Sequence, residues 1–466
     1  MSILGMDRRH WVTFNISIGV FMSTLDASIV NISLPTIIET LNTNVKAGSW
    51  VVVAYLIIIT GCLLLMGRLT DLLGQRRVYL FGFSAFTLGS ALCGLSPMIY
   101  FLIGSRVVQG VGAAALMASG PAILTSSFPD NERGKALGII GSVVSAGFLT
   151  GPLLGGFLVE HLGWRSVFFI NLPIGVVGIL LSSKVLERGA RVKKVSLDLK
   201  GAFLLFAFLT SLLLFLNGVG RATAYFFWGW LCLSLACFIL FIGIEIRSPS
   251  PLVDLRLFRT RLFTSSLAAS FLAFWMSAAH SFVMPFYLQN ILGLTPSKVG
   301  MLIFPVALTV MVLAPWGGKF SDRVGVTFPA TIGLVLTSSA VFSFVFLGGN
   351  AAYYSILWRQ IVLGIGIVLF NPANNSAIIG SLPKEKIGLA SSFLALSRNL
   401  GMVVGVAFAE MLIAFRSSVS SLETGKPSLE SIQDVWKFIL IIGLAAILTS
   451  WSRGGKRSGR LDKRVL

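Results

Sequence analysis

Long apolar stretches, separated by short polar or charged connections, fill almost the whole chain. Each stretch is close to or above the roughly 20 residues that an α-helix needs to cross a bilayer. The pattern therefore predicts an all-α integral membrane protein with fourteen transmembrane helices. The predicted spans are 11–34, 49–67, 78–96, 99–124, 135–159, 164–184, 200–219, 225–246, 263–288, 296–317, 327–347, 352–377, 388–414 and 435–452.

The basic residues are divided unevenly between the two sides of the predicted membrane. Of 37 Lys and Arg residues, 27 lie on the side of the N-terminus, 7 on the opposite side and 3 within spans. Basic connections are retained in the cytoplasm. We therefore predict a multi-pass protein of the cell (inner) membrane with both termini in the cytoplasm.

The composition narrows the function classes. A chain of 466 residues with 55% hydrophobic and 12% charged residues is not typical of a soluble protein, and the cytoplasmic connections explain its net charge of +19 without a nucleic-acid partner. The sequence contains no Walker A loop, no G-x-S-x-G elbow and no Cys/His metal cluster. We therefore expect neither enzyme activity nor a metal or other cofactor.

An internal repeat divides the chain. Gly67–Gly74 recurs as Gly318–Gly325 after 251 residues, and Arg106 recurs as Arg359 after 253 residues. Parallel repeats of this kind are typical of transporters whose binding site lies between two halves. The predicted parts are an N-terminal six-helix half at 1–185, a linker with two extra transmembrane helices at 186–262, a C-terminal six-helix half at 263–453 and a basic cytoplasmic tail at 454–466.

One acid, Asp26, lies deep within the first span. A charge at mid-bilayer costs about 2.5–3.5 kcal/mol on insertion scales, so such residues usually face a cavity and carry function. Counted at the helical rise, Asp26 and Arg106 lie roughly 6 and 7–8 Å to the same side of the middle of their spans, so they can meet. Arginine favours the charged carboxylate and desolvation the neutral acid, which predicts proton coupling. The alternatives are a permanent ion pair and an interhelical hydrogen bond.

A charged connection follows the second span with the pattern G-x-L-x-D-x-x-G-x-R-R. Its glycines permit a tight turn, and its acid and arginines can pair with each other or with a helix end. Two copies in register favour a conformational latch over a hairpin that only satisfies topology. The predicted latch residues are Gly67, Arg68, Asp71, Gly74, Arg76, Arg77 and, in the second copy, Asp322.

The fifth span carries glycines at a spacing of four residues, Gly147, Gly151 and Gly155, followed by Gly156. Glycines four residues apart share one helix face and allow another helix to approach closely. The embedded Pro152 removes a backbone hydrogen bond and favours a bend. The spacing predicts a helix-packing face rather than a chemical site.

Together these motifs resemble the major facilitator superfamily, and specifically its fourteen-helix drug:proton antiporters of the EmrB/QacA type. The resemblance rests on Leu25–Pro35, on the connection Gly67–Arg77, on Arg106–Gly112 and on Gly147–Gly156. In the family the last of these is the antiporter motif, which is expected in exporters. The resemblance covers nearly the whole chain, with most of its specificity in the first half.

The second half departs from the multidrug members of this family, which often carry further membrane acids there. Its one comparable acid is Glu410, near the outer end of its span, while His280 lies at a depth like that of Asp26. Arg359, Arg398 and these two residues are the second-half candidates for proton coupling or substrate contact. Asn371–Asn375, with Pro372, is expected to interrupt its helix and line the cavity.

The resemblance implies multidrug efflux, the secondary active export of small amphipathic toxic compounds by proton antiport and alternating access. The proton gradient would drive it without a cofactor. The alternative is an importer or facilitator of another small solute with the same fold. The expected partners are the substrates, protons and membrane lipid, and an adaptor protein is left open. No motif identifies the substrate, the coupling stoichiometry or the oligomeric state.

Overall fold

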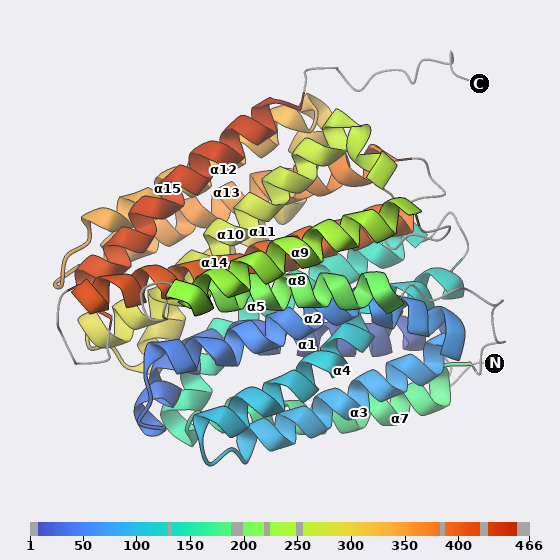
Figure 1. Cartoon of the computed structure of the whole chain (residues 1–466), viewed down its shortest axis with the longest axis horizontal. Coiled ribbons are helices and arrows are strands. Elements are labelled where there is room, and N and C mark those ends of the chain that lie inside the picture. Colours follow the sequence, from blue (N-terminus) through green and yellow to red (C-terminus); the bar gives the residue numbers. More distant parts are fainter. Residues whose placement is uncertain are drawn as a thin grey trace.

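A computed structural model describes residues 8–128, 133–187, 199–218, 224–247, 255–382, 387–419 and 427–453, which form long helices with short connections (Figure 1). The helices are α1 (Arg8–Thr40), α2 (Val45–Leu73), α3 (Gln75–Gly94), α4 (Ile99–Ser127), α5 (Arg133–Leu162), α6 (Ser166–Phe169), α7 (Asn171–Val185), α8 (Leu199–Gly218), α9 (Ala224–Arg247), η1 (Leu255–Arg259), α10 (Arg261–Phe286), η2 (Tyr287–Ile291), α11 (Pro296–Val324), α12 (Thr327–Ser343), η3 (Phe344–Phe346), α13 (Tyr353–Gly380), α14 (Ile387–Val419) and α15 (Leu429–Trp451).

The helices form two groups with a hairpin between them. Helices α1 to α7 pack against one another, and so do α10 to α15. Helices α8 and α9 pair with each other, and α8 lies against α2 of the first group and α14 of the second (Figure 1). The two groups meet mainly where α5 packs on α11 and where α2 packs on α14.

Each predicted span overlaps one helix or two consecutive helical elements, which are α6 and α7 for 164–184, α10 and η2 for 263–288, and α12 and η3 for 327–347. Within the described residues, eleven helical segments are long and apolar enough to cross a membrane. The helices outside this set are α3, α5 and α8, of which α8 contributes only the shorter apolar segment Phe203–Leu212. The chain is therefore a multi-pass membrane protein, and the number of fourteen crossings stays a prediction.

The predicted span 164–184 is broken at Ile170, between α6 and α7. Pro173, the third residue of α7, has no backbone N–H, so a continuous helix would leave the carbonyl of Phe169 without its usual donor. Proline is tolerated in the first turn of a new helix, where N–H groups have no intrahelical acceptor. The break makes Asn171 the first residue of α7.

Tight glycine turns join the helices of the repeated connection. Gly74 has φ of 92° between α2 and α3, and Gly325 has φ of 90° between α11 and α12. This is the left-handed region in which glycine carries no steric penalty. The turns predicted from the two motif copies are therefore confirmed, and each joins two antiparallel helices without a loop.

Polar contacts join the two groups at the end of the bundle away from the chain termini, here called the distal end. The Ser297 backbone N–H donates to Glu160 Oε2 at 2.8 Å, and Gln289 Nε2 donates to the Ile32 carbonyl at 2.9 Å. The backbones of α5 and α11 also touch there, because a Cβ on Gly156 would overlap the Pro296 carbonyl oxygen.

Two helices predicted to be disturbed by proline continue through it. Helix α13 runs unbroken across Asn371–Asn375, so the predicted interruption of that helix is wrong. Helix α5 also continues past Pro152, where the sequence predicts a bend rather than an interruption, and that bend stays a prediction. A proline within a helix removes one hydrogen bond, and neighbouring helices in a membrane bundle can compensate for it. Within the continuous helix, Asn374 is held by a hydrogen bond, which its Oδ1 accepts from Arg453 at 2.5 Å.

Candidate functional site

The carboxylate of Asp26 is fully buried inside the first group and is held by three side chains. Its Oδ2 forms an ion pair with Nη1 of Arg106 on α4. Its Oδ1 accepts hydrogen bonds from Gln109 Nε2 at 2.9 Å and from Asn171 Nδ2 at 3.1 Å. The structure thus brings together the two residues that helical depth predicted to meet, and it adds two amide donors.

The guanidinium of Arg106 is also bound on its other sides. Its Nε donates to the Val51 carbonyl at 2.9 Å, and its Nη1 donates to Gln109 Oε1 at 2.6 Å. Its central carbon lies 3.9 Å from the centre of the Tyr55 ring, in cation–π contact. Because Arg106 is 1% exposed and Asp26 is 0% exposed, the pair is screened from solvent.

An outer set of residues orients this cluster. Gln109 Nε2 donates to Ser90 Oγ at 2.8 Å, and Cys93 Sγ donates to Gln109 Oε1 at 3.7 Å, so α3 fixes the amide of Gln109. The Tyr55 hydroxyl donates to the Ser23 carbonyl at 3.3 Å, which ties α2 to α1. Sequence reasoning placed Gln109 in a motif without a function and missed the other residues. The one signal was the polar Asn171 in an otherwise apolar span.

The glycine face of α5 packs on α1, the helix that carries Asp26. A Cβ on Gly147 would overlap Thr24 Oγ1, and a Cβ on Gly151 would overlap Ser28 Oγ. A Cβ on Gly155 would lie 2.7 Å from Ile29 Cγ1. The predicted close approach is therefore confirmed. Since Thr24 and Ser28 flank Asp26 on α1, a change in the α1–α5 contact would act directly on the turn that holds the acid.

In the second group, His280 occupies the position that corresponds to Asp26. It follows Asp26 by 254 residues, close to the 253 residues between Arg106 and Arg359. Its surroundings are aromatic, with ring centres at 4.9 Å for Phe344 and 6.4 Å for Trp436. The equivalent of an ion-paired acid is therefore an imidazole packed in the core.

The remaining second-half candidates are Arg359 on α13 and Arg398 and Glu410 on α14. Arg359 donates from Nε to the Ser343 carbonyl at 3.1 Å and from Nη1 to the Ser355 carbonyl at 2.6 Å. Arg398 is half-buried, with its guanidinium carbon 4.8 Å from the centre of the Phe274 ring. Glu410 is buried at 1% exposure. Among the described residues of the second group, His280 takes the place of Asp26 and Arg359 donates to backbone carbonyls, which differs from the cluster around Asp26.

Of the predicted latch, the structure describes the side chains of only the arginines after the turn. Arg76 Nη2 donates to the Ser183 carbonyl at 2.6 Å, in the last turn of α7. This contact matches the predicted pairing with a helix end, where carbonyl groups carry partial negative charge. Arg77 is exposed. The side chains of Arg68, Asp71 and Asp322 lie outside the described part, and Gly67 lies within α2.

At the distal end, Glu160 connects the groups through a charged hydrogen bond. The backbone N–H of Ser297, in the first turn of α11, donates to its carboxylate and holds the pKa of Glu160 below its ordinary value. An acid near a helix N-terminus is further favoured by the exposed N–H groups there. The described residues contain no group of three or more His, Cys, Asp or Glu side chains that could hold a metal ion.

The sequence matches the Major Facilitator Superfamily over residues 16–406. The chain belongs to this family. The fold agrees with solved major facilitator structures, among them a peptide transporter POT in complex with sulfate, with a TM-score of 0.69 at 15% identity over 96% of this chain and 95% of that one. A bacterial homologue of the human lysosomal transporter Spinster, in an inward-facing and unoccupied conformation, gives 0.67 at 16% identity over 96% and 97%.

Named relatives in this superfamily include transporters of different substrates. The riboflavin transporter RibZ of Clostridioides difficile is 36% identical over 86% of this chain and 88% of its own. The multidrug resistance protein Stp of Mycobacterium tuberculosis is 31% identical over 85% and 74%. The tetracenomycin C resistance and export protein of Streptomyces glaucescens is 30% identical over 88% and 77%. The chain is therefore a transporter of small substrates, and its relatives include several drug-resistance proteins.

Proposed function

We propose that this protein exports small amphipathic compounds from the cytoplasm in exchange for protons. The observation that carries the proposal is the buried Asp26 carboxylate on α1, the helix that packs against the glycine face of α5. This carboxylate is paired with Arg106 on α4. An intramembrane acid with a cationic partner suits a proton carrier, since its charge is stable only while that partner stays close. The relatives named for drug resistance and export support the direction of transport.

In the proposed cycle, Asp26 takes up a proton when α1 and α4 separate enough to weaken its contact with Arg106. The neutral acid no longer needs the guanidinium, and re-approach of the two helices favours proton loss. Movement of α1 against Gly147–Gly155 couples this exchange to rocking of the two helix groups, in which the distal contacts open while the opposite side closes. Substrate leaves by the distal end.

As part of the same proposal, we assign the chain to the drug:proton antiporters with fourteen transmembrane helices. The N-terminal and C-terminal halves, 1–185 and 263–453, are the moving parts, and α8 and α9 are the extra pair between them. The uneven distribution of basic residues supports cytoplasmic termini, which places the distal end outside the cell. The latch at Gly67–Arg77 closes the cytoplasmic side when the distal end opens.

Inverted membrane vesicles test the proposal. After the vesicles are energised so that their interior is acidic, addition of a transported compound should release protons and raise the fluorescence of a pH-sensitive dye. A panel of cationic, neutral and anionic toxins, first ranked by the resistance they elicit in an efflux-deficient host, supplies the compounds. Vesicles with Asp26→Asn should show no release. Resistance without any proton movement would contradict antiport.

A second candidate function is transport of riboflavin or a related planar heteroaromatic compound. It is favoured by the 36% identity to the riboflavin transporter over 86% of this chain. Growth of a riboflavin auxotroph at limiting riboflavin tests it. Rescue of growth by the wild type, without resistance to any toxin of the panel, would favour uptake over export.

A further inference from the structure

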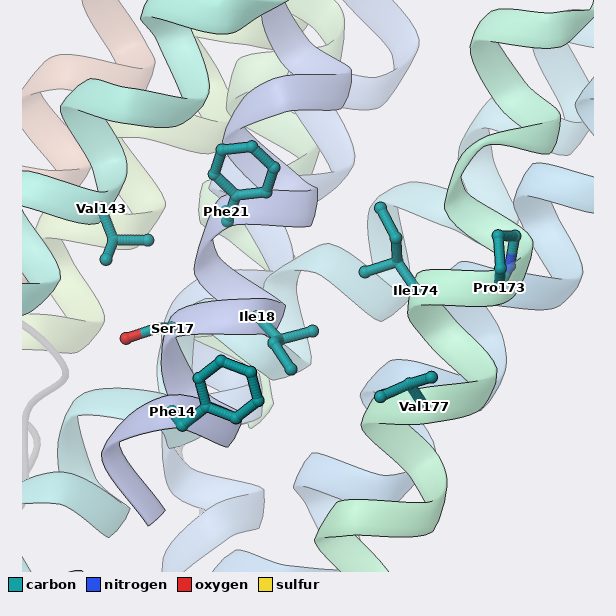
Figure 2. Close-up of a pocket in the computed structure, with 8 residues that line it drawn as sticks. All are labelled: Phe14, Ser17, Ile18, Phe21, Val143, Pro173, Ile174 and Val177. Carbon is teal, nitrogen blue, oxygen red and sulfur yellow. The ribbon is translucent and has the colours of Figure 1, made fainter. Parts of the chain in front are cut away.

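An apolar furrow runs along the flank of the first group, between α5 and α7, with α1 as its floor (Figure 2). Its volume is about 560 Å³, within the roughly 300–1,000 Å³ of ligand-binding pockets. Figure 2 shows Ile18 on α1 at one side of the gap and Ile174 and Val177 on α7 at the other. The lining residues are Phe14, Ser17, Ile18, Phe21, Val143, Pro173, Ile174 and Val177.

The furrow faces outward from the bundle rather than between the two groups. Helix α5 forms one wall and packs on α11 of the other group, whereas α7, the other wall, packs on α3 at the far side of its own group. Phe14 is 52% exposed and Val177 is 47% exposed, although both are apolar. In a membrane protein, such a surface on the perimeter contacts lipid.

The cation Lys184 and the polar side chain of His10 lie at the end of the furrow nearest the chain termini. On α7, Lys184 follows Val177 by seven residues, which places both on the same helix face, and Lys184 is exposed. On α1, exposed His10 precedes Phe14 by four residues on the face that lines the furrow. The nearby acid Glu187 is paired with Arg8, so it leaves Lys184 available to an anion.

The length of this face matches one leaflet. From His10 to Phe21 the helix rises through eleven residues, about 16 Å, and half of a hydrocarbon core of about 30 Å is about 15 Å. An acyl chain that begins at the level of His10 and Lys184 therefore reaches Phe21 near the bilayer centre. A lipid of the leaflet on the side of the termini fits this register.

We propose that the furrow binds one acyl chain of an anionic phospholipid whose headgroup contacts Lys184. The apolar lining accepts the chain, and the cation at the mouth selects the headgroup, since a basic side chain at the membrane surface contributes about 1 kcal/mol toward anionic lipid. The site is separate from the transport pathway between the two groups. It also lies beside the turn of α7 that begins with Asn171, so a bound chain supports the helix that donates to Asp26.

Native mass spectrometry of the full-length protein in detergent tests the site. The probes are phosphatidylglycerol and phosphatidylcholine with identical acyl chains. The wild type should retain phosphatidylglycerol preferentially. Ser17→Trp, which fills the floor, should reduce retention of both lipids, and Leu235→Trp, at a 52% exposed position on α9, is the matched control that should not. Val177→Trp fills the furrow from the opposite wall if Ser17→Trp is not produced in folded form.

The charge at the mouth is tested separately. Lys184→Gln should reduce retention of phosphatidylglycerol to the level of phosphatidylcholine, while Arg247→Gln, an exposed cation at the same end of the bundle on α9, should leave the preference intact. Unchanged lipid retention in both tryptophan variants would overturn the furrow as the site. A preference that survives Lys184→Gln would overturn the proposed headgroup contact.

Discussion

At the residue scale, the pair of Asp26 and Arg106 has two separable properties, stability and titration. Truncating one member of a buried ion pair costs about 3–5 kcal/mol, because it leaves the other charge buried and unpaired. Replacing both members by neutral hydrogen-bonding groups removes that penalty. If the pair is only structural, the double replacement should therefore leave proton-coupled transport intact. If Asp26 carries the proton, the double replacement should abolish that transport even though stability recovers.

We predict that Asp26→Asn and Arg106→Gln each lower thermal stability in detergent, and that the double variant recovers most of the loss. None of the three should carry out proton-coupled transport, since none retains the titrating acid with its partner. Thermal unfolding of the purified proteins and the vesicle assay are the two measurements. Uphill transport by the double variant would show that the pair is structural.

His280 is the residue whose interpretation the structure changes most. Its position matches that of Asp26, but it is packed against Phe344 and Trp436. We predict that His280→Leu, which places an apolar side chain in this aromatic setting, retains proton-coupled transport with an unchanged pH profile. The profile is measured with substrate-driven proton release between acidic and alkaline pH. A shifted profile would instead assign proton coupling to both groups.

How much of the site could be predicted depends on helix rotation. That Asp26 and Arg106 could meet followed from their similar depth, because depth is set by sequence position at a fixed rise per residue. The contacts of Asn171, Ser90 and Tyr55 depend on which way α7, α3 and α2 turn about their axes. Packing sets that rotation, and no local pattern reports it. The break before α7 was missed for a similar reason, since apolar residues continue through it.

At the element scale, the contact between α1 and α5 brings a glycine face against the turn of α1 that carries Asp26. A methyl group on Gly151 would overlap Ser28 Oγ, whereas one on Gly104, in α4, meets no atom within 4 Å. The two glycines therefore serve as test and control for an added methyl group, since Gly151 is crowded and Gly104 is open. Both lie within helices, so the loss of glycine itself is controlled.

We predict that Gly151→Ala slows transport and that Gly104→Ala does not. The added methyl group separates α1 from α5 or forces Ser28 to move, and either change alters the turn that carries Asp26. Adding Ser28→Gly to Gly151→Ala removes the overlapping atoms and should restore part of the rate. Initial rates in vesicles, normalised to the amount of protein, measure this. Equal rates for the two alanine variants would remove α5 packing from the mechanism.

The distal contact between Glu160 and α11 should depend on pH outside the cell. The pKa of Glu160 is lowered in the closed arrangement because the Ser297 N–H donates to the charged carboxylate. Its contribution to closure is therefore fully present above the ordinary pKa of a glutamate. It is lost as pH falls through the lowered value, where the carboxylate takes up a proton.

We predict that Glu160→Gln increases the population of the open distal end and makes it insensitive to acid pH. Spin labels on Leu162→Cys and Met301→Cys, in a background with Cys232→Ser, report the distance between the ends of α5 and α11. Glu430→Gln is the control, since Glu430 pairs with Arg416 within the second group. An identical distance distribution for Glu160→Gln and wild type would exclude this contact as part of the closure.

At the scale of the whole molecule, the number and direction of the membrane crossings depend on α8. The fold class and the helix positions followed from hydropathy and repeats, since both are properties of the order of residues. The family followed from the resemblance of the motifs at Leu25–Pro35, Gly67–Arg77, Arg106–Gly112 and Gly147–Gly156. The helices outside the clearly apolar set include α8, one member of the extra pair. Whether α8 crosses decides whether the two halves keep the same orientation with a hairpin between them.

We predict that alkaline phosphatase fused after residue 221 is active and that the same enzyme fused after residue 453 is inactive. Activity requires an exported enzyme, so the first result places the α8–α9 connection outside the cell and the second places the C-terminus in the cytoplasm. A green fluorescent protein fused after residue 453 provides the complementary signal. Inactive phosphatase after residue 221 would reduce the count to twelve crossings.

Helix α1 makes contacts on several sides in this arrangement. One face holds Asp26 against α4 and α7, another receives the glycines of α5, a third forms the floor of the furrow, and its distal end accepts the hydrogen bond from Gln289. In a library of all single substitutions selected for growth on a toxin, α1 should therefore tolerate the fewest changes of any transmembrane helix. Variants that gain new substrates should arise instead on α10, α13 and α14, where the corresponding positions lack the ion-paired cluster. Under the proposed function, a transporter built in this way changes its substrates by mutation of one half while the proton-coupling residues of the other half stay constant.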